Sequence, residues 1–221
     1  MHLSLTIIII IITCLVSLSA FGSRKILNDL IFYPAWVHDK NQFYRFFTYG
    51  FIHADLMHLI FNMYAFYLFG GFIEDAFISL FGTVQGKLFY ILLYVLALIF
   101  SVIPDYKKYK GNYQYSSLGA SGAVSAVVFA FILLNPLQGI GLIFIPIFIP
   151  GFIFGILFLV ISYYLGKRGG SRINHNAHIW GAVFGIIFLI IVCNLFSNFP
   201  VLQNFIYQVK NMKMDQLFQT Y

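Results

Sequence analysis

A serine and a histidine each stand at the start of an apolar segment, where they could do nucleophilic chemistry. Ser121 follows Gly119 and Ala120 and precedes a run of small and apolar residues, and His178 opens a second such run. A serine hydroxyl becomes a nucleophile when a neighbouring imidazole accepts its proton. Ionisable groups are rare in membrane spans and are usually paired or functional there. The two side chains therefore predict a nucleophile–base pair, provided that the two segments meet.

Composition places the chain among membrane proteins. Of its 221 residues, 61% are hydrophobic and 9% are charged, whereas soluble domains carry about 25% charged residues. The net charge of +6 comes from short basic groups that flank the apolar runs. Lipid headgroups explain such groups, so we expect no nucleic-acid partner. Cys14 and Cys193 lie inside apolar runs and are expected to be buried thiols.

The apolar runs are long enough to cross a bilayer, which requires roughly 20 residues of helix. Lipid favours helices because they satisfy their backbone hydrogen bonds internally. The first run has no basic segment before it, so we expect it to be retained rather than removed as a signal peptide. We predict an all-α polytopic membrane protein, a six-transmembrane-helix bundle with spans over 3–20, 56–80, 87–103, 119–135, 142–165 and 177–196.

The chain divides into two predicted parts. Residues 1–198 form the six-helix membrane domain, and residues 199–221 form a tail. After Pro200 the apolar residues of the tail fall on one helical face, which is typical of a helix lying in the membrane interface. The residues of this face are Leu202, Phe205, Ile206, Val209 and Met212.

Further polar residues are expected at the depth of Ser121 and His178. His58 and Asn62 are four residues apart in the second predicted span, so they share one helix face. The long connections 21–55, 104–118 and 166–176 precede the second, fourth and sixth spans and therefore lie on one side of the membrane. All four polar residues consequently enter from that side, a few residues into their helices.

The fourth and sixth predicted spans also carry stripes of small residues. These recur every four positions, as Gly122, Ala126 and Ala130 in one span and Ala177, Gly181 and Gly185 in the other. Such stripes let helix backbones pack closely in lipid. A tight crossing here could bring the Ser121 hydroxyl within hydrogen-bond reach of the His178 imidazole, about 2.6–3.2 Å.

Taken singly, each of these features has a structural interpretation. Ser121 could bond the carbonyl one turn before it, and His58 with Asn62 could form an interhelical hydrogen bond worth about 0.6 kcal/mol. Their shared depth and the small-residue stripes favour the functional interpretation. Several histidines gather at this end of the spans, but no H-E-x-x-H motif or companion carboxylate accompanies them. We therefore expect no metal site and no cofactor.

Several short motifs stand in one order along the chain. They are Tyr44-Arg45, Phe51-Ile52-His53, His58-Leu59-Ile60-Phe61-Asn62, Gly70-Gly71-Phe72-Ile73-Glu74, Gly119-Ala120-Ser121-Gly122 and Ala177-His178-Ile179-Trp180-Gly181. With these motifs the chain resembles the rhomboid family of intramembrane serine proteases, over about residues 40–190. The last two resemble the family's G-x-S-G nucleophile motif and its A-H-x-x-G base motif.

The resemblance implies an activity and a site. Ser121 and His178 would form a catalytic dyad, and the backbone N–H of Ser121 with His58 and Asn62 would hold the oxyanion. Substrates would be transmembrane segments of other membrane proteins, met within the lipid bilayer. Arg45, His53, Glu74 and Gly119 are motif residues that would support this site.

The chain departs from the family pattern at two positions. Tyr44 stands where the family usually has a tryptophan. Ser125 follows the nucleophile by one helical turn, where some members place a tyrosine that stacks on the catalytic histidine. The resemblance therefore leaves open which residue orients the His178 ring.

Two indications of orientation disagree. The three long connections hold ten of the 13 basic residues, which would place that side in the cytoplasm by the positive-inside rule. The family precedent for a six-helix member places the active site outside. We follow the family and expect a multi-pass protein of the plasma membrane with its active site facing outward.

Two other functions compete with proteolysis. A catalytically inactive rhomboid relative would bind membrane clients without cutting them, but such relatives typically lack the serine or the histidine. A small transporter or channel would more often show ionisable pairs at mid-membrane or half-sequence repeats, and the sequence has neither.

Overall fold

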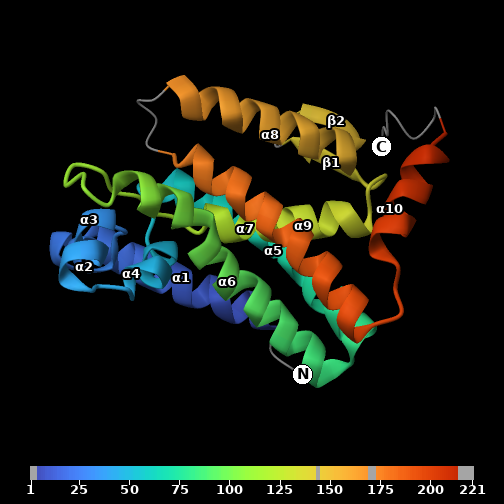
Figure 1. Cartoon of the computed structure of the whole chain (residues 1–221), viewed down its shortest axis with the longest axis horizontal. Helices are drawn as coiled ribbons and strands as arrows, with labels where there is room; N and C mark the ends of the chain where they lie inside the picture. Colours follow the sequence, from blue (N-terminus) through green and yellow to red (C-terminus); the bar gives the residue numbers. More distant parts are fainter. Residues whose placement is uncertain (1–3, 143–144, 169–172, 214–221) are drawn as a thin grey trace.

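A computed structural model describes residues 4–142, 145–168 and 173–213. This part of the chain is mostly helical (Figure 1). Four helices are long and apolar enough to cross a membrane, namely α5 (Leu56–Phe81), α6 (Thr83–Tyr109), α8 (Gly151–Arg168) and α9 (His175–Phe196). Two apolar helices are shorter, α1 (Leu5–Phe21) and α7 (Ser121–Leu134).

Helix α7 is the centre of the bundle. Every residue from Gly122 to Leu133 is buried, because this helix is apolar on all sides and presents no polar face to solvent. Helices α5, α6 and α9 pack around it, and α9 makes the most extensive contact. Helix α1 lies outside α5, and α8 packs more lightly against α9 and α7. The residue at the start of α7 is therefore held from several directions.

The first two long connections and the described ends of the third lie at one end of the bundle (Figure 1). The first is folded into short helices, α2 (Arg24–Leu30), α3 (Pro34–Lys40), α4 (Arg45–Thr48) and the 3-10 turn η1 (Tyr49–Phe51). Phe32 and Ser117 exchange backbone hydrogen bonds of 3.0 Å, which joins the first connection to the second. The Asn174 side chain donates to the Ser117 hydroxyl at 3.0 Å and joins the third.

The structure corrects the prediction of an all-α fold. Strands β1 (Gly139–Leu142) and β2 (Ile145–Pro150) form an antiparallel hairpin between α7 and α8. The fifth predicted span, 142–165, therefore began too early, because its first residues belong to this hairpin and α8 begins only at Gly151. Pro146 and Pro150 explain the difference, since proline cannot continue a helix interior.

The predicted ends of two other spans also differ from the structure. The third predicted span stopped at 103, whereas α6 continues through Pro104 to Tyr109. The fourth was predicted over 119–135, whereas α7 occupies only Ser121–Leu134. Residue 3, where the first span was predicted to begin, lies outside the described residues.

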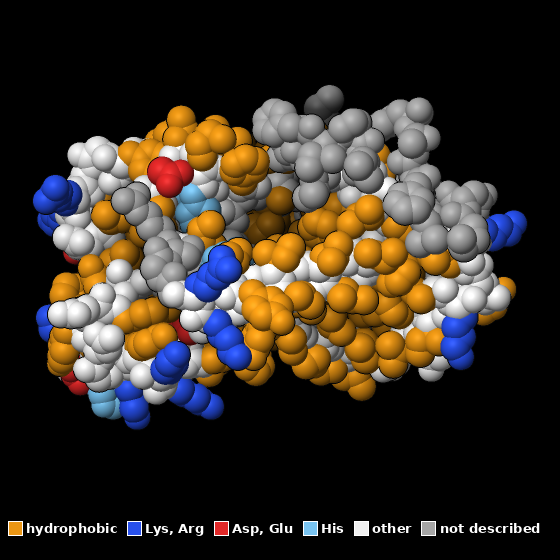
Figure 2. All heavy atoms as spheres, turned by 90° about the horizontal axis from the view of Figure 1, so that it is seen from above, with side chains coloured by type: hydrophobic (Ala, Val, Ile, Leu, Met, Phe, Trp, Pro, Cys, Tyr) orange, Lys and Arg blue, Asp and Glu red, His pale blue; other side chains and the backbone are white. Residues whose placement is uncertain are grey.

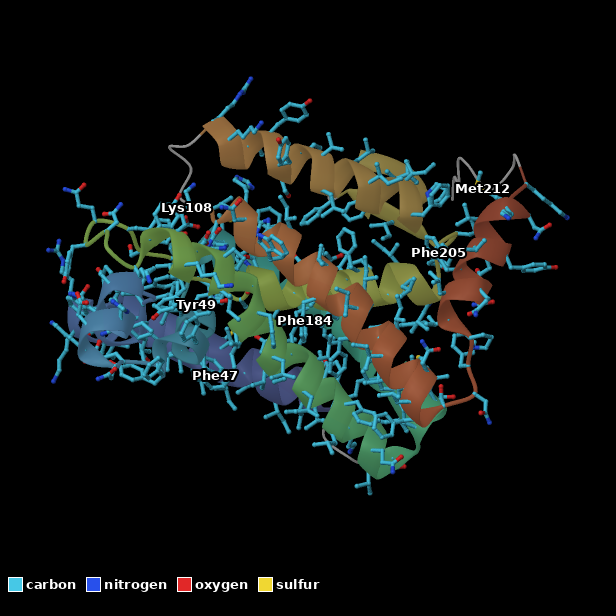
Figure 3. The ribbon with its side chains drawn as sticks, in the orientation of Figure 1. Phe47, Tyr49, Lys108, Phe184, Phe205 and Met212 are labelled. Carbon is cyan, nitrogen blue, oxygen red and sulfur yellow. The ribbon has the colours of Figure 1, made fainter. Side chains whose placement is uncertain are left out.

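A further helix, α10 (Val201–Lys210), follows Pro200. Phe205 points from it toward the bundle and packs on the core (Figure 3). Leu202 and Ile206 are exposed. The helix contacts both α7 and α9. The last part of the predicted tail, 214–221, lies outside the described residues.

Candidate active site

The four polar residues singled out from the sequence line one cavity of about 490 Å³. The remaining lining is apolar and comes mainly from α5, α7 and α8, with Ala54 and Ile173 from the connections. The molecule is hollowed on this side, with hydrophobic side chains in the hollow and a histidine beside it (Figure 2). The polar lining residues are Asp55, His58, Asn62, Ser121, Ser125 and His178.

Ser121 is the first residue of α7. The first hydrogen bond of this helix runs from the Val124 N–H to the Ala120 carbonyl at 3.0 Å. The N–H groups of residues 121–123 therefore have no partner within the helix, and together with the helix dipole they favour negative charge at this point. The serine hydroxyl lies beside these donors.

Gly119 sets the entry into this turn. Its φ of 111° lies in the region that favours glycine, and its N–H donates to the Tyr49 carbonyl at 3.0 Å. A Cβ at this position would lie 2.8 Å from Cε1 of His58. Only glycine therefore allows the loop before Ser121 to approach the His58 ring this closely.

His178 lies in the first turn of α9. Asn174 caps that helix by accepting from the Ala177 N–H at 3.0 Å. The His178 ring stacks on Phe158, with centroids 5.6 Å apart and planes inclined by 24°. The ring of His175 meets it edge-on at 5.7 Å and 81°.

The expected hydrogen bond between Ser121 and Nε2 of His178 is not formed in this structure. Nε2 of His178 is buried and has no hydrogen-bond partner among the residues described. The contacts with Phe158 and His175 hold the ring instead. The serine and the imidazole share a cavity, and in the tautomer with its proton on Nδ1 the ring can accept a proton at Nε2.

His58 lies in the first turn of α5, which Asp55 caps by accepting from the His58 N–H at 2.8 Å. Nδ1 of His58 accepts from the Ala54 N–H at 3.5 Å. This bond assigns the ring proton to Nε2, which is buried and, within the described ranges, unpaired. Asn62 donates one amide hydrogen to the His58 carbonyl at 2.9 Å and keeps the other. Both residues therefore retain a donor.

The small residues of α7 and α9 meet at the crossing of these helices. A Cβ added at Gly181 would overlap the Gly122 carbonyl, and one added at Gly185 would overlap the Ala126 carbonyl. The backbones therefore touch at both positions. Ser121 directly precedes Gly122, so this crossing sets how α7 presents the serine to the start of α9.

His53 lies behind the cavity rather than in it. Its side chain is 1% exposed. Nε2 accepts from the Ala120 N–H at 3.4 Å, and Nδ1 donates to the Ser17 hydroxyl at 2.9 Å. That hydroxyl in turn donates to the Phe51 carbonyl at 2.8 Å. Burial lowers the pKa of His53 to about 3, so a neutral imidazole ties α1 to the residue before Ser121.

Arg45 and Glu74 lie outside the cavity. Arg45 is 2% exposed, and Nη1 donates to the carbonyls of Asn28 at 2.8 Å and Ile31 at 2.6 Å, which ties the first connection together. Glu74 accepts from the N–H groups of Leu5 at 2.8 Å and Thr6 at 3.0 Å at the other end of α5. These two motif residues hold the fold.

Sequence reasoning missed a buried carboxylate, Asp105. It accepts from the Tyr115 hydroxyl at 2.8 Å and from the side-chain amides of Asn174 at 2.5 Å and Asn176 at 3.2 Å. Burial and this carboxylate raise the pKa of Tyr115. Asp105 thus connects the loop before Ser121 with the cap of the His178 helix. The two asparagines just before Ala177-His178 were the available signal, since asparagine is a strong helix cap.

No three His, Cys, Asp or Glu side chains gather as a metal site within the portion of the chain that the structure describes. The polar side chains of the cavity are the Ser121 hydroxyl beside unpaired backbone donors, the imidazoles of His58 and His178, the Asn62 amide, the Ser125 hydroxyl and the Asp55 carboxyl group. This combination can activate a hydroxyl and receive a developing negative charge.

Comparison with known proteins gives a family for this arrangement. The model of the Rhomboid domain family matches residues 40–195. The chain is also 32% identical over 101 residues to the rhomboid protease GlpG of Haemophilus influenzae, an alignment that spans 45% of each protein. The chain thus aligns with less than half the length of this curated relative. With its multiple apolar helices it is an integral membrane protein, and it belongs to the rhomboid family.

Proposed function

We propose that this protein is an intramembrane serine endopeptidase that cleaves transmembrane segments of other membrane proteins. The observation that carries the proposal is the single cavity shared by Ser121, His178, His58 and Asn62. Within it one ring nitrogen is free to accept a proton, and His58 keeps a free donor. The named protease among the relatives supports the same reaction class.

In the first half of the reaction, the Ser121 oxygen attacks the scissile carbonyl carbon while Nε2 of His178 accepts the hydroxyl proton. The carbonyl oxygen becomes an oxyanion. It is held by the Ser121 N–H, by Nε2–H of His58 and by the free amide hydrogen of Asn62. Donors of this kind each stabilise the transition state by about 2.7–4 kcal/mol.

In the second half, the C–N bond breaks and His178 gives its proton to the leaving amine. Water then attacks the acyl-serine with His178 again as base, which releases the carboxylate product and restores the hydroxyl. The open Nε2 fits this sequence, because catalytic hydrogen bonds are commonly long without substrate and tighten in the complex.

The depth of the cut follows from the short central helix. We propose six membrane crossings in which α1 and α7 span together with the four longer helices. The 14 residues of α7 extend about 21 Å, against a hydrocarbon core of about 30 Å. If its far end reaches the opposite interface, Ser121 lies roughly 9 Å below the near surface. A substrate helix would have to unwind to expose a peptide bond there.

For the cellular location, we propose the plasma membrane, with the cavity opening toward the outside. Family precedent supports this orientation against the basic residues of the long connections. The positive-inside rule is a statistical bias, and four of the ten basic residues lie in the first connection, which is folded into α2 to η1. We propose that α10 lies along the opposite interface.

The test compares wild type with Ser121→Ala and His178→Ala in liposomes that carry a single-span test substrate. Each variant should lower kcat at least about 10³-fold, with product termini that map within the substrate's span. Ser79→Ala and His38→Ala change exposed residues and should cleave like wild type. Cleavage by Ser121→Ala would overturn the nucleophile. A folded wild type that binds substrates but cuts none would favour the client-binding alternative.

A further inference from the structure

The ring that covers His178 comes from α8. Phe158 lines the same cavity as Ser121 and stacks on the imidazole at 5.6 Å and 24°. This is the offset parallel geometry in which aromatic pairs attract each other. On α7, the residue one turn after Ser121 is Ser125, which is buried and has no ring to offer. Among the described residues, the phenyl ring that stacks on His178 is that of Phe158.

Phe158 is itself held in place. Its ring contacts Phe129 of α7 at 5.8 Å and Phe154 of its own helix at 6.1 Å. It is only partly buried and packs against the core. The ring is therefore fixed from two sides and turns a face toward His178.

We propose that Phe158 is the positioning residue for the His178 base. This inference rests on the proposed proteolysis. The stacked ring limits rotation of the imidazole, so that the His178 side chain keeps its place in the lining of the cavity. The face of an aromatic ring also attracts a cation, so the contact strengthens when His178 accepts the serine proton. Because that charge exists in the transition state and not before, the contact should act on kcat more than on KM.

Because the ring belongs to α8, the alignment of the His178 imidazole depends on how this helix packs. Helix α8 buries only Gly151, Gly155 and Ser162 among its 18 residues, and the sides of α8 that face away from the bundle are exposed. The base is therefore aligned by the helix that packs most lightly among the long spans. A displacement of α8 would remove the ring from the imidazole without disturbing the α7–α9 crossing.

The test uses two substitutions at one position and a matched control. Phe158→Leu keeps an apolar side chain and removes the ring, whereas Phe158→Tyr keeps the ring. Tyr164→Leu removes an aromatic side chain of the same helix that is 63% exposed. In liposomes, Phe158→Leu should lower kcat about tenfold, with KM within about twofold. Phe158→Tyr and Tyr164→Leu should both stay within about threefold of wild-type kcat.

A second measurement is independent of turnover. The Cε1 proton of His178 should show an upfield ring-current shift in wild type and in Phe158→Tyr, assigned by its loss in His178→Ala. Phe158→Leu should remove the shift while the melting temperature stays within about 2 °C. This spectrum tests the contact even if the wild type proves unable to cleave, in which case the proposed proteolysis fails on its own evidence.

Three results would overturn the inference. Unchanged kcat in Phe158→Leu would show that the ring does not act on the base. A raised KM with unchanged kcat would make Phe158 a part of the substrate site only. Equal losses in the Leu and Tyr variants, accompanied by lowered melting temperatures, would reduce its role to packing.

Discussion

The polar side chains at the two ends of α5 differ in their hydrogen bonding. At one end Glu74 is 4% exposed and accepts from both backbone and hydroxyl donors at the start of α1, including Thr6 Oγ1 at 2.9 Å. The Tyr90 hydroxyl, 2.6 Å from that threonine, extends the network. At the other end, about 24 Å away along the helix, Nε2 of His58 is buried and unpaired.

This difference separates structural from functional polarity in a membrane protein. A buried polar group without a partner is costly in lipid, so a group that only holds the fold should be satisfied, as Glu74 is. Two further unpaired atoms among the described residues are the hydroxyls of Thr13 and Tyr94, which do not line the cavity of Ser121. An unpaired polar atom therefore points to chemistry where its residue also lines a cavity, as His58 and His178 do.

The largest effect on stability is expected at the end of α5 where Glu74 is fully hydrogen-bonded. Glu74→Ala leaves the N–H groups of Leu5 and Thr6 without their acceptor and should lower the free energy of unfolding by about 3–5 kcal/mol. Activity per folded molecule should stay near wild type. Unfolding in detergent, read together with cleavage, measures both quantities. Loss of turnover in fully folded Glu74→Ala would contradict the purely structural role of Glu74.

The opposite pattern, a loss of activity with little loss of stability, is expected at the end of α5 that carries His58. His58→Ala should lower kcat by about 10²–10³, since a missing oxyanion donor costs about 2.7–4 kcal/mol. Its melting temperature should change little, because Nε2 has no partner and Nδ1 loses only a long bond of 3.5 Å from the Ala54 N–H. Steady-state cleavage by His58→Ala, with the exposed His38→Ala as the matched control, measures the effect. A loss of kcat that only follows the loss of folded protein would contradict the role of His58 as an oxyanion donor.

Asp105 sharpens the comparison because it is fully bonded yet lies close to the site. Asp105→Ala removes the acceptor for Tyr115, Asn174 and Asn176 and should lower the free energy of unfolding by about 2–3 kcal/mol. It should also lower kcat in the molecules that remain folded, since Asn174 caps the His178 helix. Parallel melting and cleavage curves measure both effects. An unchanged kcat would assign Asp105 to the structural class with Glu74.

A smaller, pH-dependent effect is expected from His53. Its pKa is about 3 in the folded protein against a usual value of 6.5, so the unfolded chain binds a proton that the native protein does not. Stability contributed by the neutral ring is complete above pH 6.5 and falls as the pH drops toward 3. Between pH 7 and pH 5 the loss should be about 2 kcal/mol. Denaturant unfolding should show this slope in wild type and a flatter one in His53→Gln.

Much of the bundle follows from the sequence, because lipid leaves few options for long apolar segments. The helices around Ser121 and His178 and the stripes that include Gly122 and Gly181 could be predicted from spacing alone. The hairpin before α8 could not be predicted from hydrophobicity, since strand and helix are equally apolar there. Pro146 and Pro150 were the signal that should have moved the start of that helix.

The parts of the site that were missed depend on contacts distant in sequence. Asp105 appeared to stand in a loop after the third span, and only the fold brings it to Asn174, 69 positions away. The stack of Phe158 on His178 joins two helices whose facing sides no periodicity reveals. Local patterns predict which residues can react, whereas the groups that position them emerge only from packing.

The most direct test of the central claim is covalent labelling of the reconstituted protein with a fluorophosphonate, followed by peptide mass mapping. This reagent reports an activated serine without requiring a substrate. We expect one adduct, on Ser121, that disappears in His178→Ala and persists in the folded fraction of Glu74→Ala. Labelling of another serine, or labelling of Ser121 at the wild-type rate without His178, would contradict the account.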